Sequence, residues 1–282
     1  MAFELDEVRI AVHGGNRGHA SSPHWLGGGV TWRVINASAI GTSHLAGGHP
    51  CQDTCFVDSL KAPDGAEYLV CLVSDGAGSA RYAEQGSDLA CTTAMACIEA
   101  TVARGVGVCD SDVGDWVAGV QAAVQKAADA VGATARDYAC TLLGAIVGQG
   151  SALFFQVGDG AIVVTSPAVQ GVVFWPDAGP YANMTHFVTD DDALENLTIA
   201  SAHVDVEEIA LFSDGLQRLA LAFETKLPHQ PFFEPMFSVL RRTQSSECEG
   251  LSTQLGQFLN SPQVNERTDD DKTLILATRR TV

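Results

Sequence analysis

An Asp-Gly pair recurs in this chain, and in three of its four occurrences it ends an apolar run. The pairs are Asp64-Gly65, Asp75-Gly76, Asp159-Gly160 and Asp214-Gly215. The first has polar neighbours and follows a proline, so a turn accounts for it. The other three end strand-like segments, and if those strands are neighbours their carboxylates meet at one rim. The recurrence therefore predicts either separate hairpins or one acidic cluster.

Apolar and β-branched segments predict that strands dominate the chain. They cover residues 30–40, 54–60, 67–74, 138–148, 152–158, 161–166, 172–176 and 207–213, with a last strand after the acidic stretch at 269–271. Helices are predicted over 82–104, 113–131, 216–223, 235–242 and 250–259. Gly158-Asp159-Gly160 would join two strands as a tight hairpin. This order predicts an α/β (α+β) fold with mostly antiparallel strands and helices packed outside.

Neither a Pro-rich linker nor a repeat divides residues 30–282, which we therefore interpret as a single domain. Residues 1–29 include a Gly-, Ser- and His-rich stretch without periodicity and predict a flexible leader. The polar segment 177–201 is expected to form a surface insertion.

The chain carries 34 acidic and 16 basic side chains, a net charge of −18. Nucleic acids and anionic membranes need a basic surface, so both are excluded as expected partners. No apolar run reaches the ~20 residues of a membrane span, and no secretory signal begins the chain. The eight scattered cysteines indicate free thiols in a reducing compartment. We expect a cytoplasmic protein.

Two other sites suggest themselves. The strand, glycine-rich turn and helix around Asp75 are typical of dinucleotide binding, but the G-x-G-x-x-G spacing breaks at Arg81 and Asp75 would repel a pyrophosphate. Cys51 and Cys55, with nearby histidines, would make half of a zinc site whose second half is missing.

The acids that adjoin predicted strands are Asp53, Asp75, Asp159, Asp214 and those at 269–271. Two carboxylates ~4 Å apart repel by about 4 kcal/mol at an effective dielectric of 20. A cluster of several therefore persists only by protonation or by binding cations. Oxygen ligands without Cys or His favour Mg²⁺ or Mn²⁺ over zinc. Independent solvated turns remain the simpler explanation for any one acid, but not for the set.

Six motifs in order resemble the metal-dependent serine/threonine protein phosphatases of the 2C class, in particular a compact bacterial branch. They are QD (Gln52-Asp53), SDGAGSA (Ser74–Ala80), CTLL (Cys140–Leu143), VGDG (Val157–Gly160), LFSDGLQR (Leu211–Arg218) and DDKTLIL (Asp270–Leu276). The resemblance covers roughly residues 31–278. It implies a four-layer α-β-β-α sandwich, with two mostly antiparallel sheets flanked by helices.

The resemblance also implies two Mn²⁺ or Mg²⁺ ions in a cleft at one end of the sandwich. Asp75 would bridge both ions, and the Gly76 carbonyl would reach one of them. Asp214 and Asp270 would complete the second site, and Asp53 would act through ion-bound waters.

The resemblance further implies a third ion, bound more weakly by Asp159 and Asp214. In the acidic stretch we choose Asp270, because it stands three residues before Thr273 as in the family's Asp-Asn-x-Thr, with Asp271 as the alternative. The implied reaction is attack by a metal-bridging hydroxide on phosphoserine or phosphothreonine, with Asp75, Asp214 and a proton donor as catalytic residues.

Two family features are missing from this chain. The histidine that often follows the second motif's Asp-Gly as general acid is replaced by Ala77, and the arginine that grips phosphate is absent. We expect His44 to act as the catalytic proton donor and to bind substrate together with His49 and Arg33, with Arg81 as a weaker candidate.

The sequence thus predicts an active protein serine/threonine phosphatase whose partner is a phosphoprotein, the target of a cognate serine/threonine kinase. The alternative is a catalytically weak or inactive relative that binds phosphoproteins as a regulator. A third hypothesis, an acidic calcium-binding β-protein, lacks the D-x-D-x-D-G loop.

Overall fold

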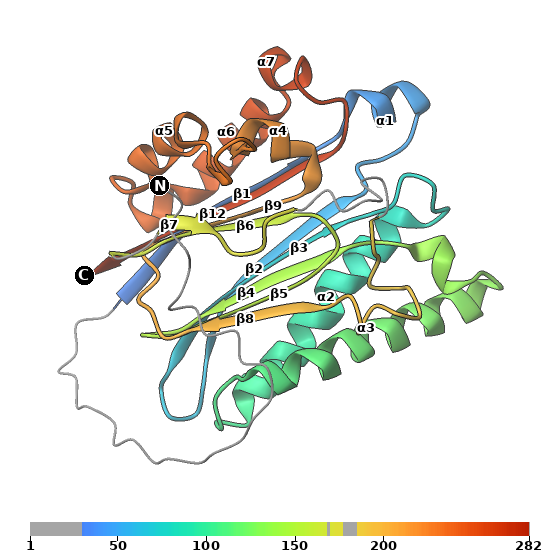
Figure 1. The fold of residues 1–282 in the computed structure, drawn as a ribbon, viewed down its shortest axis with the longest axis horizontal. Coiled ribbons are helices and arrows are strands. Elements are labelled where there is room, and N and C mark those ends of the chain that lie inside the picture. The colour runs from blue at the N-terminus through green and yellow to red at the C-terminus, as the bar shows by residue number, and fades with distance from the viewer. Residues whose placement is uncertain (1–29, 168–169, 177–184, 282) are drawn as a thin grey trace.

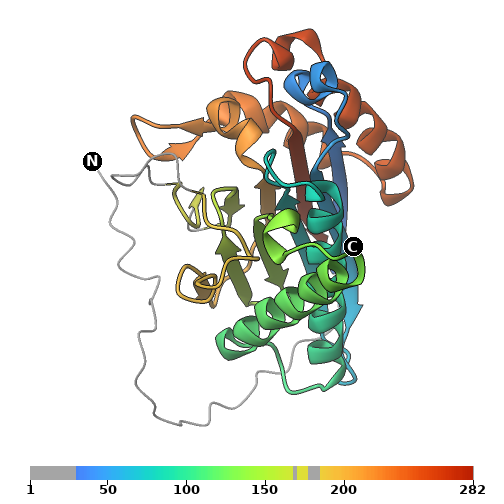
Figure 2. The same cartoon turned by 90° about the vertical axis from the view of Figure 1, so that its right-hand side faces the viewer.

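The computed structural model describes residues 30–167, 170–176 and 185–281, so the predicted leader at 1–29 lies outside the described residues. Two five-stranded sheets lie face to face between two groups of helices (Figures 1 and 2). Every pairing between described strands is antiparallel. The predicted four-layer sandwich is confirmed.

The first sheet has the strand order β1 (Val30–Ala39), β12 (Lys272–Thr281), β9 (Glu208–Phe212), β6 (Ala161–Thr165) and β7 (Gln170–Val172). The second has the order β2 (Asp53–Lys61), β3 (Glu67–Asp75), β4 (Leu142–Val147), β5 (Ala152–Val157) and β8 (Thr198–Ala202). A small hairpin, β10 (Leu221–Ala222) with β11 (Leu227–Pro228), stands apart from both.

The helices cover the two outer faces. The second sheet packs against α2 (Ala83–Ala103) and α3 (Asp110–Val131), and the first against α4 (Gln217–Ala220), α5 (Gln230–Leu240) and α6 (Cys248–Leu259). Two short helices, α1 (Thr42–Gly47) and α7 (Pro262–Asn265), lie close together at one end of the sandwich (Figure 1). None of the described helices has both the length and the apolar character that a bilayer crossing requires.

The apolar run before Asp75 is explained by burial on both faces of β3. Val70 and Leu72 pack with α2 and α3, whereas Cys71 and Val73 pack against the other sheet. A strand covered on both faces is apolar at every position rather than at alternate ones. Asp75 is therefore carried to the end of a fully buried strand, where the interior meets the rim.

Several predicted elements need correction. Residues 158–160 do not form a hairpin, because β5 and β6 belong to different sheets and the chain crosses between them there. The predicted insertion ends in a strand, β8, that completes the second sheet. Helix α1 was not predicted, helix α5 begins five residues before the expected Pro235, and the helix expected over 216–223 ends at Ala220.

Candidate functional site

Asp53 and Asp75 lie directly opposite each other on β2 and β3. Side chains opposite each other in an antiparallel pair project from the same face of the sheet. Cys55 and Val73, two residues along the same strands, contact the core between the two sheets. Since side chains alternate with period two, Asp53 and Asp75 project into the same inter-sheet space, at its end.

Asp53 is held by the opposite sheet. Its Oδ2 accepts a 2.6 Å hydrogen bond from the Ser213 hydroxyl, and Thr273 also hydrogen-bonds the carboxylate. The Ser213 hydroxyl in turn accepts a 3.0 Å bond from the Thr273 backbone N–H. This chain of bonds fixes the ends of β2, β9 and β12 to one another. The sequence analysis did not predict this role for Ser213 or Thr273, although both lie within the motifs LFSDGLQR and DDKTLIL.

Asp75 and Asp214 are close enough for their carboxyl groups to share a hydrogen bond. Burial raises the pKa of both carboxyl groups, and neighbouring carboxylates raise it further. Burial likewise raises the pKa of Asp53 to about 7, against the opposing effect of its hydroxyl partners. The three acids therefore form one electrostatic group.

Asp159 and Asp270 border this group, since the charge of each raises the pKa of Asp214. The backbone carbonyl of Asp159 accepts a 2.6 Å bond from the Gln217 side chain, and its Oδ2 accepts a 2.7 Å bond from Thr185. The crossing between the sheets thus places Asp159 beside the start of the 3₁₀ turn that contains Asp214.

Gly76 lets the chain turn away from β3 without leaving the site. Its N–H donates a 3.1 Å hydrogen bond to the Gln52 carbonyl. A Cβ at this position would lie 2.6 Å from the Ala83 carbonyl oxygen and 2.8 Å from that of Gln52, closer than side chains tolerate. Glycine is required here by the close approach of two backbone segments.

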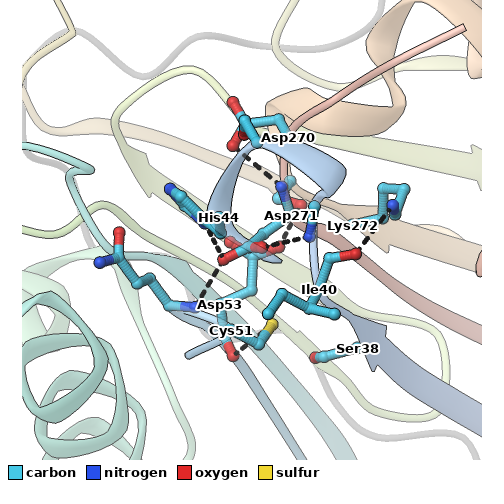
Figure 3. A network of polar contacts seen from close by, with 12 residues as sticks. Ser38, Ile40, His44, Cys51, Asp53, Asp270, Asp271 and Lys272 are labelled. Atoms are coloured by element: carbon cyan, nitrogen blue, oxygen red, sulfur yellow. Dashed lines mark hydrogen bonds and ion pairs between the residues drawn. The ribbon is translucent and has the colours of Figure 1, made fainter. Parts of the chain in front are cut away.

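Asp271 is hydrogen-bonded to the loops around it (Figure 3). Its side chain is 2% exposed, and its two oxygens accept 2.6 Å hydrogen bonds from the backbone N–H groups of Gly41 and Gln52. It also lies 2.8 Å from His44 Nδ1. Asp270 is exposed, and its Oδ1 accepts a bond from the N–H of Asp271. Asp270 therefore stays the predicted ligand.

The two histidines of the α1 loop lie near each other, with ring centroids 6.2 Å apart. His44 is partly buried and His49 exposed. They do not make a zinc site with Cys51 and Cys55: among the described residues, these four do not bring three ligand atoms within 4.8 Å. All eight cysteines are free.

The two candidate arginines are placed less favourably. Arg33 pairs with Thr278, six residues along β1 from Ala39, which at ~3.3 Å per residue is roughly 20 Å from the acidic end. Arg81 lies over the ring of Tyr82, with its guanidinium 5.0 Å from the ring centroid. The structure does not bring Arg33 to the aspartates.

The acidic group fits divalent cations. Asp53 Oδ1 and Asp214 Oδ1 are buried without a hydrogen-bond partner, an arrangement that is costly for a carboxylate unless a cation satisfies it. Carboxylate oxygens suit Mg²⁺ or Mn²⁺. Two ions ~4 Å apart with bonds of ~2.1 Å are bound by oxygens as much as about 8 Å apart, so the ligands need not touch one another.

A second candidate position for an ion was missed by sequence reasoning. Of the described residues, only His186, Asp190 and Asp192 bring three potential ligand atoms within 4.8 Å of one another. Asp190 Oδ2 accepts a 2.8 Å bond from the Phe187 N–H, so a local turn explains part of the arrangement. The spacing H-x-x-x-D-x-D is the signal in the sequence that marks it.

Two antiparallel sheets between helix layers, with carboxylates from both sheets gathered at one end, define an α-β-β-α sandwich of the phosphatase type. Residues 40–260 match the family model described as "Protein phosphatase 2C". The chain belongs to the protein phosphatase 2C family.

Individual relatives agree with this assignment. The chain is 41% identical over 249 residues to serine/threonine-protein phosphatase 3 of Escherichia coli (strain K12), covering 88% of this chain and 98% of that protein. Its fold is similar to the solved S. agalactiae serine/threonine phosphatase (TM-score 0.55, 15% identity, 88% and 99% covered). It is also similar to PppA, a regulatory component of T6SS in Pseudomonas aeruginosa (TM-score 0.55, 20% identity, 89% and 98% covered).

We expect stabilisation by Mn²⁺ to grow with pH. The pKa of Asp53 is raised by burial to about 7 from its ordinary value of 3.8, so the folded protein holds this proton more tightly than the unfolded chain. The contribution of this bound proton to the stability of the folded protein is complete below about pH 4 and is lost as the pH rises through 7. In thermal unfolding, Mn²⁺ should raise Tm clearly at pH 7.5 and little at pH 5. Equal shifts at both pH values would contradict this.

Proposed function

We propose that this chain is a Mn²⁺- or Mg²⁺-dependent phosphatase that hydrolyses phosphoserine and phosphothreonine in proteins. The observation that carries the proposal is the gathering of Asp53, Asp75 and Asp214 from both sheets, with two buried carboxylate oxygens left without partners. Family membership supports the reaction, and so does the 41% identical relative, which is named a serine/threonine-protein phosphatase.

Each acid has a role in this proposal. Asp75, Asp214 and Asp270, with the Gly76 carbonyl, would hold two ions, and Asp53 would act through waters. Asp159, beside Asp214, would help to hold a third ion. When bound, the ions would lower the pKa of a shared water towards neutrality and offset charge on the phosphoryl oxygens.

Side chains of this protein supply the proton donor and the phosphate-binding groups. His44, at the edge of the acidic group, donates a proton to the leaving serine or threonine oxygen. His44 and His49 also take over phosphate binding from the missing arginine, a role for which Arg33 lies too far away. The substrate is a phosphoprotein made by a serine/threonine kinase, whose action this phosphatase opposes.

The test is phosphate release from a phosphothreonine peptide. We expect release in Mn²⁺, loss with a chelator, recovery when Mn²⁺ is restored, and a loss of at least ~100-fold in Asp214→Asn because a ligand to the ions is removed. Peptide binding without release would instead identify a phosphoprotein-binding regulator. A larger thermal shift with Ca²⁺ than with Mn²⁺ would favour a calcium-binding protein.

A further inference from the structure

The Asp271 carboxylate is among the most firmly held side chains at the acidic end of the sandwich. It is 2% exposed, and one 2.6 Å hydrogen bond to each oxygen ties it to the backbone on both sides of the α1 loop, at Gly41 and Gln52. Both oxygens of this side chain act as acceptors, whereas an asparagine would keep only one of them. Asp271 is therefore a fixed acceptor.

His44 is the side chain that faces this fixed acceptor. Its Nδ1 lies 2.8 Å from Asp271 Oδ2, although the ring is turned away from ideal hydrogen-bond alignment. Its Nε2 lies on the other side of the ring, 3.5 Å from where a Cβ would stand on Gly78, in the loop that follows Asp75. His44 is 16% exposed, so the ring remains accessible to a substrate.

Two departures from the family pattern occur together here. The position after Asp75-Gly76 is Ala77, which has no proton to give, and Asp271 stands where Asp-Asn-x-Thr has asparagine. An asparagine would not provide a carboxylate for an imidazole. The loss of one proton donor thus coincides with a carboxylate that can orient another.

We propose that Asp271 is a positioning residue that holds His44 Nε2 toward the leaving oxygen of a phosphorylated serine or threonine. The inference rests on the proposed function. As the phosphorus–oxygen bond breaks, its electron pair stays on the seryl oxygen, which takes the Nε2 proton, while the attacking water supplies the new phosphate oxygen. His44 is left neutral with its Nδ1 proton on the Asp271 side, and solvent restores the Nε2 proton.

The test compares two leaving groups. A seryl alkoxide needs a proton as it leaves, whereas a nitrophenolate does not. We expect His44→Gln and Asp271→Asn each to lower kcat on a phosphoserine peptide by about 100-fold, but kcat on p-nitrophenyl phosphate by less than about fivefold. Any phosphate binding lost with His44 would raise KM for both substrates alike. The double variant should be no slower than the slower single variant, because one residue acts through the other. Asp269→Asn removes an exposed charge two residues before Asp271, and its kcat on both substrates should match that of wild type.

The ratio between the two substrates separates this role from general damage. If Asp271→Asn slows both by the same factor, or if the two substitutions multiply, Asp271 is merely structural and the inference is wrong. If wild type with Mn²⁺ hydrolyses neither substrate, the proposed function itself has failed.

A second measurement needs no activity. In ring ¹⁵N spectra of the metal-free protein, neutral His44 should carry its proton on Nδ1 in wild type and lose that preference in Asp271→Asn. A wild-type His44 protonated on Nε2 overturns the inference even if both variants are slow.

Discussion

Replacing Asp75 with asparagine is expected to abolish Mn²⁺-dependent phosphate release, with a fall in kcat/KM of at least ~10³-fold. Asp75 lies in register with Asp53, and its carboxyl group is close enough to that of Asp214 to share a hydrogen bond, so it links acids from both sheets. A loss of ~10³-fold corresponds to about 4 kcal/mol of transition-state stabilisation, the scale expected when a bridging ligand is lost.

The same substitution is expected to leave the metal-free protein folded, and more stable than wild type at pH 7.5. Burial and neighbouring acids raise the pKa of Asp75, so this carboxyl group lowers the stability of the folded state at any pH above its ordinary pKa. Asparagine removes the charge. Thermal unfolding should therefore show a higher Tm without Mn²⁺ and a smaller shift on adding it.

Asp64→Asn is the matched control, because Asp64 also precedes glycine. Its Oδ1 accepts a 3.0 Å bond from the Ala66 N–H in an exposed turn, and asparagine retains that acceptor. Activity should stay within about twofold of wild type. If Asp75→Asn retains activity comparable to Asp64→Asn, the two-ion proposal is wrong.

The strand ends could be predicted from the sequence because a strand buried on both faces is an uninterrupted apolar run, and the run stops where the strand stops. The run before Asp75 and the run before Asp214 both end where the structure ends a strand, and both acids lie at the same end of the sandwich. The Asp64-Gly65 pair, flanked by polar residues, is the turn that its neighbours indicate.

The pairing of strands within the sheets could not be predicted from the sequence. Gly158-Asp159-Gly160 has the form of a hairpin, yet the chain crosses there from one sheet to the other, because the pairing of β5 with β4 and of β6 with β9 depends on long-range packing. The Asp-Asn-x-Thr spacing led to Asp270 from the sequence alone, but the contacts of Asp271 depended likewise on the unpredicted α1 loop. The backbone N–H groups of Gly41 and Gln52 bind both oxygens of Asp271.

Replacing Gly215 with alanine is expected to destabilise the protein and to disable the site together. A Cβ on Gly215 would run into the backbone carbonyl of Asp271, which is part of the chain rather than a mobile side chain. The backbone of Gly215 is not in the left-handed region, so the cost comes from this contact and not from its dihedral angles. Moving Asp271 displaces the neighbouring Asp270 and shifts the carboxylate that faces His44.

We expect Gly215→Ala to cost about 1–3 kcal/mol, which lowers Tm by roughly 2–10 °C in a chain of this size, and to reduce Mn²⁺-dependent activity far more than stability. Gly250→Ala is its control. Gly250 is exposed in α6 with nothing within 4 Å of its would-be Cβ, so alanine there should raise stability by about 0.5–1 kcal/mol through helix propensity. If Gly215→Ala unfolds and hydrolyses like wild type, the close approach of the Asp214 turn to β12 is not what places Asp270 beside Asp214.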